Sequence, residues 1–136
     1  MAIEKTLSII KPNAVKQKHV GEIISMLEQN NLRISQMRML QLDNVQAKMF
    51  YQEHIGKSFF DELLNFMLSG EIVVLKLEGE NAIARYRELM GATNPCDAKE
   101  GSIREKFGDK TDLTQNAVHG SDSKESAKRE LALFFK

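Results

Sequence analysis

A lone histidine lies in a string of small and polar residues near the end of the chain, where it could do chemistry. The string, NAVHGSDS, spans residues 116–123 and places His119 directly before Gly120. The apolar pair before the histidine is typical of the end of a buried strand, and glycine permits backbone angles that other residues disfavour. The three residues after the glycine are all suitable helix N-caps. The string therefore predicts a strand, a tight turn and a helix start, with the imidazole near a helix end that attracts anions.

This histidine has two interpretations when its own string is considered alone. The commoner one is a packing residue, and the other is a functional group at an anion site. A metal site is disfavoured because His19, His54 and His119 are scattered without the spacing of metal ligands. The chain holds neither Gly-x-x-x-x-Gly-Lys-Ser/Thr nor Gly-x-Gly-x-x-Gly, so any ATP would be bound without those phosphate loops.

The composition is that of an ordinary soluble globular protein. With 136 residues, 42% of them hydrophobic and 28% charged, we expect a single domain over residues 1–136. The 19 basic and 19 acidic residues cancel, so no overall positive field would hold nucleic acid or an anionic membrane. One cysteine, Cys96, excludes an internal disulfide and indicates a reducing compartment. The amino end has no apolar signal-peptide core, so we expect a cytoplasmic protein.

Apolar periodicity and cap residues predict the elements that must position the histidine. Asp43 and Gln46 match a capping box, and a change of parity predicts a β-bulge near residues 35–36. The four methionines between residues 26 and 49 are expected to fill the core. Strands are expected at 6–10, 32–42, 71–77 and before the histidine, and helices from about 20, 43, 58, 80, 102 and 123.

The order of these elements, β-α-β-(α-α)-β-α-loop-β-α, predicts the fold class. It fits an α+β, ferredoxin-like split β-α-β fold with a four-stranded antiparallel sheet covered by helices on one face. This topology alone indicates nothing about function.

Several strings along the chain together resemble nucleoside diphosphate kinases. The string around His119 resembles the active-site signature of that family, and the likeness continues at residues 11–13 (KPN), 93–95 (TNP) and 101–104 (GSIR). In that family the histidine takes the terminal phosphoryl group from a nucleoside triphosphate such as ATP and passes it to a different diphosphate. The resemblance covers nearly the whole chain. It implies an enzyme, a phosphotransferase that works by a ping-pong reaction through a phosphohistidine on His119.

The resemblance also implies the site residues. His119 is the nucleophile, and Glu130 is the carboxylate that fixes the tautomer of its ring. Mg²⁺ would bridge the outer phosphates without a direct protein ligand, and Asp122 could hold it through water. The implied nucleotide-binding residues are Lys11, Tyr51, Arg87, Thr93 and Arg104 at the phosphates, Asn116 at the sugar hydroxyl, Phe59 stacked on the base, and Leu113 packed against it.

Most of these residues also have an ordinary structural interpretation. Lys11 could be a solvated lysine at a strand end, and both Phe59 and Phe60 could lie in the core. Arg87 could interact with the dipole of the helix that ends near it. Glu130 could be a solvated helix charge. Taken without the resemblance, these alternatives stay open.

Departures from the family pattern keep a second function open. Asn13 stands where the family has aspartate, and Ser58 stands where it usually has proline. Glu71 also replaces a common proline, and we expect that departure to be structural. Arg104 and His119 are separated by about two more residues than in the family. The alternative is a family relative that binds nucleotides or a protein partner and transfers nothing. A sensor domain on the same topology would need the histidine string to be accidental.

The resemblance finally implies the partners. These are nucleoside di- and triphosphates and further copies of the same chain, with no nucleic acid and no membrane. Family members form tetramers or hexamers, and almost no tail follows residues 134–135, so we expect a homotetramer rather than a hexamer.

Overall fold

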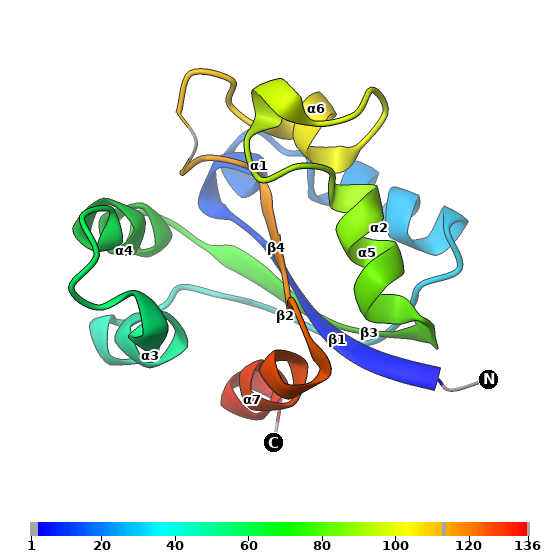
Figure 1. The fold of residues 1–136 in the computed structure, drawn as a ribbon, viewed down its shortest axis with the longest axis horizontal. Coiled ribbons are helices and arrows are strands. Elements are labelled where there is room, and N and C mark those ends of the chain that lie inside the picture. The colour runs from blue at the N-terminus through cyan, green and yellow to red at the C-terminus, as the bar shows by residue number, and fades with distance from the viewer. Residues whose placement is uncertain (1–2, 113, 136) are drawn as a thin grey trace.

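The computed structural model describes residues 3–112 and 114–135. Within these residues, the strands form one antiparallel sheet with the order β2-β3-β1-β4 (Figure 1). The strands are β1 (Ile3–Ile10), β2 (Arg33–Leu40), β3 (Ile72–Glu80) and β4 (Val118–Gly120). The short β4 pairs with β1, and this pairing sets His119 opposite Ile9. The order confirms the predicted α+β ferredoxin-like class.

Helices cover both faces of the sheet, so the prediction of one covered face is wrong. The first face carries α1 (Pro12–Lys16), α2 (Val20–Gln29), α5 (Ala82–Met90) and α6 (Ile103–Phe107). The second face carries α3 (Asn44–Phe50), α4 (Phe60–Leu68) and α7 (Lys124–Phe134) (Figure 1). Two 3-10 turns, η1 (Gln52–His54) and η2 (Pro95–Asp97), lie in the connections.

The physical reason for two covered faces lies in the central strands. Ile72, Val73, Val74 and Leu75 of β3 are all buried, although consecutive side chains point to opposite faces. A strand that is apolar on both faces needs cover on both. The continuous apolar run at residues 72–75 is the feature of the sequence from which cover on both faces could have been predicted.

Local signals placed most elements correctly. Asp43 and Gln46 form the predicted capping box at the start of α3, and the pairing of β2 with β3 shifts between Ile34 and Gln36, where the bulge was predicted. The helices expected from about 58 and 80 each begin two residues later. α4 begins at Phe60 without a side-chain cap, and α5 begins at Ala82 because Glu80 still belongs to β3.

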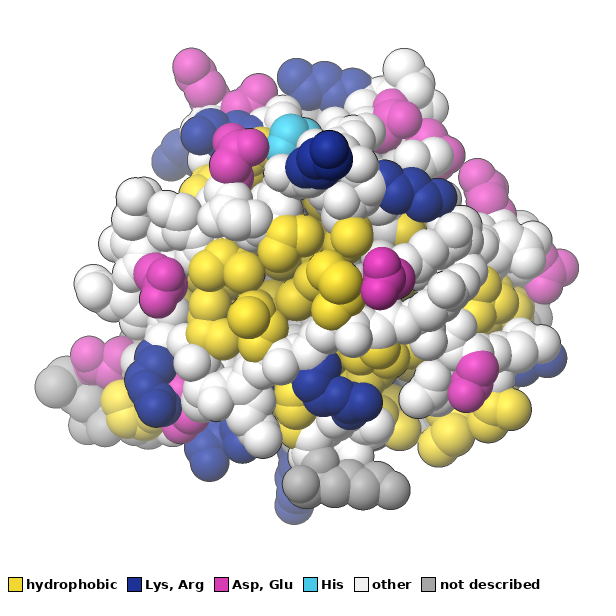
Figure 2. Space-filling view, turned by 180° about the vertical axis from the view of Figure 1, so that it is seen from behind, with side chains coloured by type: hydrophobic (Ala, Val, Ile, Leu, Met, Phe, Trp, Pro, Cys, Tyr) yellow, Lys and Arg dark blue, Asp and Glu magenta, His cyan; other side chains and the backbone are white. Residues whose placement is uncertain are grey.

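The methionines of β2 do not fill the core. Met37 and Met39 are 55% and 54% exposed, and Met49 of α3 is 49% exposed. β2 is an edge strand with a single neighbour, so its outer side chains gain little cover. Figure 2 shows hydrophobic side chains gathered in the middle of the molecule's reverse face. Across the described ranges, no helix has the length and apolar character needed to cross a membrane.

Candidate functional site

One cleft, of about 410 Å³, brings together ten of the eleven residues for which the sequence analysis gave a catalytic, nucleotide-binding or magnesium role; the eleventh, Leu113, lies outside the described residues. The α3–α4 hairpin, the loop after α5, β4 and α7 all contribute residues to its lining. The cleft residues that were expected are Lys11, Tyr51, Phe59, Arg87, Thr93, Arg104, Asn116, His119, Asp122 and Glu130.

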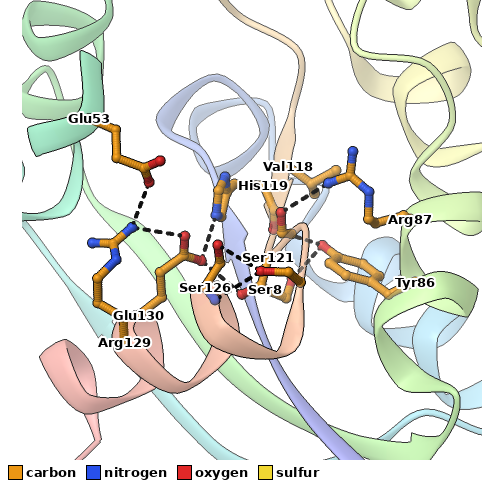
Figure 3. Close-up of polar contacts among 12 residues, drawn as sticks. Ser8, Glu53, Tyr86, Arg87, Val118, His119, Ser121, Ser126, Arg129 and Glu130 are labelled. Atoms are coloured by element: carbon orange, nitrogen blue, oxygen red, sulfur yellow. Dashed lines mark hydrogen bonds and ion pairs between the residues drawn. The ribbon is translucent and has the colours of Figure 1, made fainter.

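His119 lies in the middle of β4 and is held through one ring nitrogen. Its Nε2 is 3.0 Å from Oε1 of Glu130 (Figure 3), and the Phe50 ring packs against the imidazole in a T-shaped contact, with 5.0 Å between centroids. Among the described residues, Nδ1 makes no hydrogen bond. The carboxylate therefore favours the tautomer with the proton on Nε2 and leaves the Nδ1 lone pair available.

Glu130 is itself firmly held. It is only 5% exposed, and Ser121 donates to its Oε1 at 2.8 Å while Arg129 lies 3.5 Å from its Oε2. Burial lowers the pKa of His119, and the hydrogen bond to Glu130 opposes that effect only in part. The imidazole is therefore neutral near pH 7, which is the form that can attack an electrophile.

Lys11 lies at the end of β1 and is buried rather than solvated. It is 6% exposed, its backbone N–H donates to the Ala117 carbonyl at 2.8 Å, and its Nζ donates to Oδ1 of Asn116 at 2.8 Å. Burial, helped by the nearby Arg104 charge, lowers the pKa of Lys11 to about 7. Asn116 in turn donates to the Thr93 carbonyl at 2.9 Å.

Two guanidinium groups flank His119 along the backbone of β4. Arg104 donates to the Val118 carbonyl at 2.9 Å and also to the Gly91 carbonyl at 3.1 Å. Arg87 donates to the Gly120 carbonyl at 3.4 Å (Figure 3). The Nε of Arg104 is buried without a partner among the described residues. Two cations therefore lie on either side of the histidine, where they could pair with phosphate oxygens.

The backbone around the histidine differs from the predicted one. Gly120 has no left-handed φ; glycine is needed because a Cβ there would lie 2.7 Å from Met90 Cε and 2.8 Å from the Tyr86 ring. The left-handed residue is Ala117, with φ of 74°, so the strand begins after it. The Val118 N–H donates back to the Asn116 carbonyl at 2.9 Å, which makes a strained γ-turn next to the site.

The aromatic residues of the α3–α4 hairpin have different exposures. Tyr51 is 6% exposed and its hydroxyl has no partner among the described residues. Phe59 is 44% exposed at the mouth of the cleft, near the His54 ring and 5.8 Å below Nζ of Lys57. The core interpretation therefore holds for Phe60 and not for Phe59. Leu113 lies outside the described residues.

Asp122 also lines the cleft, and a hydrogen bond from Ser126 lowers its pKa. An ionised carboxylate at the cleft fits Mg²⁺, a hard cation that keeps several waters and takes few protein ligands. In residues 3–112 and 114–135, no three His, Cys, Asp or Glu side chains are grouped for metal binding.

Among the cleft residues to which the sequence analysis gave no role are Phe50, Glu53 and Arg129. Phe50 packs on the His119 ring, and Arg129 donates to Glu53 at 3.0 Å across 76 positions of the chain. No spacing rule links residues so far apart. The apolar helical pattern of α3 could have identified Phe50 as buried, without its contact to the histidine.

The cleft combines a neutral imidazole with the side chains of Lys11, Arg87 and Arg104, which is the arrangement that a phosphotransferase needs. The family model described as nucleoside diphosphate kinase matches residues 4–136, and the chain belongs to that family. It is 54% identical over 133 residues to the nucleoside diphosphate kinase of Chlamydia pneumoniae, covering 98% of this chain and 91% of that one. It is 52% identical to that of Bdellovibrio bacteriovorus, covering 99% and 94%.

Solved structures agree with this membership. The nucleoside diphosphate kinase of Aquifex aeolicus superposes with a TM-score of 0.95 at 40% identity, covering 99% of this chain and 96% of that one. The halophilic enzyme of Halobacterium salinarum, solved in complex with CDP, gives 0.94 at 37% identity, covering 99% and 89%. Phosphoryl transfer between nucleotides is the function of this family, and the resemblance found in the sequence is confirmed.

Proposed function

We propose that the chain transfers the terminal phosphoryl group of a nucleoside triphosphate, such as ATP, to a nucleoside diphosphate through a phosphohistidine on His119. The observation that carries this proposal is the hydrogen bond from Nε2 to Glu130. That bond commits one ring nitrogen and leaves Nδ1 unpaired among the described residues, in a cleft lined by Lys11, Arg87 and Arg104.

In the first half-reaction the Nδ1 lone pair of His119 attacks the γ-phosphorus. The P–N bond forms as the bond from that phosphorus to the β,γ-bridging oxygen breaks, and the diphosphate leaves with the electron pair. The ring keeps its proton on Nε2 and becomes cationic, and Glu130 balances that charge. In the second half-reaction a terminal oxygen of another diphosphate attacks the phosphorus, the P–N bond breaks, and neutral imidazole is restored.

The cations of the cleft would hold the phosphates in line with the ring. Arg87 and Arg104 lie on either side of His119 and offer the paired N–H groups that phosphate oxygens accept. Lys11 would exchange its neutral partner Asn116 for a phosphate oxygen, which frees the amide to bind the sugar hydroxyl. Thr93, at the exposed rim, would contact the same phosphates.

Phe59 and Tyr51 have the exposure that their proposed roles need. The Phe59 ring is open at the cleft mouth and would stack on the base, which suits any base because each has a π-face. The buried Tyr51 hydroxyl would gain its missing partner from a phosphate oxygen. Neither residue reads the edge of a base, so we expect little preference among nucleotides.

Magnesium is the proposed cofactor. It would neutralise the outer phosphates when bound, and Asp122 would orient it through a water molecule.

We propose that the chain is a single domain and forms a homo-oligomer, with the tetramer as the sequence-based expectation. The open edge of β2, with Met37 and Met39 exposed, supports an interface between copies, because such edges are usually covered. Light scattering would give the number of subunits, and a monomer at working concentration would contradict the proposal. The exposed free thiol of Cys96 supports a cytoplasmic location.

Labelling with γ-³²P ATP tests the mechanism. The protein should retain one acid-labile phosphate, His119→Ala should retain none, and His19→Ala should label normally, because His19 packs against Phe107 away from the cleft. An acid-stable label, or a label on the His119 variant, would contradict the phosphohistidine. Nucleotide binding without any label would select the binding-module alternative.

A further inference from the structure

Arg129 joins two parts of the cleft that are distant in sequence. Its Nη2 lies 3.0 Å from Oε1 of Glu53 and 3.5 Å from Oε2 of Glu130 (Figure 3). Glu53 belongs to η1, in the hairpin that forms one side of the cleft, whereas Arg129 and Glu130 belong to α7. One guanidinium group therefore connects the hairpin to the carboxylate that holds the histidine.

The two oxygens of Glu130 have separate partners. Oε1 receives both His119 Nε2 and Ser121 Oγ, at 3.0 and 2.8 Å. Among the described residues, Oε2 has Arg129 as its partner. Without that cation, an oxygen of a residue that is 95% removed from solvent would be left unpaired, and the carboxylate would be free to rotate.

We propose that Arg129 is a positioning residue of the transfer reaction and that Glu53 positions Arg129. This inference rests on the proposed phosphohistidine mechanism. Arg129 fixes the plane of the Glu130 carboxylate, so that Oε1 accepts from Nε2 and Nδ1 stays unprotonated. Glu53 draws the guanidinium group toward the hairpin and supplies the charge that balances it. The charges thus alternate from Glu53 through Arg129 to Glu130. This chain of contacts ends at the ring of His119, which becomes cationic during transfer.

The contact is poorly suited to a purely structural role. Arg129 is 31% exposed in its side chain and Glu53 is 63% exposed. Exposed ion pairs contribute little to folding stability, because solvent screens them and two long side chains must be ordered. We therefore expect the thermal midpoint of unfolding to change little when Glu53 is replaced, while the transfer rate falls.

The test compares three variants in rapid-quench phosphorylation by ATP. Arg129→Met should lower the maximal rate of phosphohistidine formation by about ten- to a hundredfold, by analogy with the loss of the partners that orient metal-binding histidines, with the KM for ATP unchanged. Arg129→Lys should recover most of the rate, since an ammonium can still reach both carboxylates. Lys128→Met, on the same helix but outside the cleft, is the matched control and should behave as the parent.

Two further measurements separate positioning from substrate binding. Glu53→Gln should slow phosphorylation by a smaller factor than Arg129→Met, and the double variant should be no slower than Arg129→Met alone, because both act through one contact. The imidazole ¹⁵N shifts of His119 should report the Nε2–H tautomer in the parent and a mixture in Arg129→Met. A normal rate in Arg129→Met, or a raised KM at an unchanged maximal rate, would overturn the inference.

The two proposals fail in different ways. Absence of an acid-labile label on the parent protein would refute the mechanism itself. A normally labelled parent, together with an Arg129→Met variant that matches Lys128→Met, would refute only the positioning role.

Discussion

The ammonium nitrogen of Lys11 lies 2.8 Å from the amide oxygen of Asn116, 105 positions further along the chain. The pairing of β1 with β4 brings these two residues together. Asn116 is a neutral partner, so it accepts a hydrogen bond without balancing the charge. Burial and the nearby Arg104 charge therefore lower the pKa of Lys11 to about 7. At neutral pH, Lys11 is protonated and cationic in only a part of the molecules.

Nucleotide binding should consequently take up a proton at Lys11. A bound phosphate would raise the pKa of this lysine, so the affinity for ADP should weaken as the pH rises above 7, approaching about tenfold per pH unit. Calorimetry at pH 8 in buffers of different ionisation enthalpy measures the uptake directly. The binding enthalpies measured in the different buffers are first corrected for the nucleotide's own titration. In Lys11→Met, the difference that remains between buffers should disappear. The exposed Lys16→Met should preserve it, and equal uptake in both variants would contradict the prediction.

Replacing Glu130 by glutamine should move the acid limb of the pH–rate profile to lower pH. The carboxylate raises the pKa of His119 against the larger effect of burial, so its loss should lower that pKa further. The imidazole then stays neutral to lower pH, and the acid limb of the phosphorylation rate should move down. The maximal rate should nevertheless fall by about 10²-fold, because no charge balances the cationic ring. Glu125→Gln, in the first turn of the same helix, is the control; an acid limb that moves up would refute this account.

Replacing Arg87 and replacing Arg104 should both slow transfer, but only the second replacement should lower the stability of the fold. Each alanine replacement should slow transfer by about 10²–10³-fold, since each removes a cation beside the reacting phosphate. Arg104 is 8% exposed and donates to the carbonyls of Gly91 and Val118, so Arg104→Ala should also cost about 1–3 kcal/mol of unfolding free energy. Arg87 is exposed and should cost little. Urea titration beside steady-state kinetics checks both, and parent activity in both variants would mean that phosphate binds elsewhere.

Gly120 should be intolerant of a side chain for steric reasons. A Cβ there would meet Tyr86, whose ring is fixed by the contact between its hydroxyl and Ser8, so Gly120→Ala should destabilise by about 1–3 kcal/mol. Gly21, at the start of α2, has nothing within 4 Å of its Cβ position. Gly21→Ala should therefore stabilise by about 0.5–1 kcal/mol. Opposite signs in urea unfolding are expected, and equal effects would contradict the steric explanation.

Much of the fold could be predicted because its signals are local. The capping box at Asp43 and the bulge before Gln36 depend on residues within one turn or one strand pair. The cover on both faces was missed, although the apolar run in β3 contained it. The exposure of Met37 and Met39 could not be predicted, because it depends on β2 lying at the edge of the sheet.

The members of the site could be named from strings that resemble a family, whereas their contacts could not. The sequence gives no sign that Lys11 is buried, that Ala117 has a left-handed backbone, or that Gly120 is packed against Tyr86. Each of these facts arises where β1, α5 and β4 meet, and these segments are far apart along the chain.

The amino-acid sequence by itself determined the kinds of element, the family and the side chains available for phosphoryl transfer, because those depend on short strings. Only the tertiary structure decided which nitrogen of His119 faces Glu130 and which cation faces the other carboxylate oxygen. Such choices depend on distances of a few ångströms between segments that are joined through the sheet and its two layers of helices. No pattern within one segment can encode them.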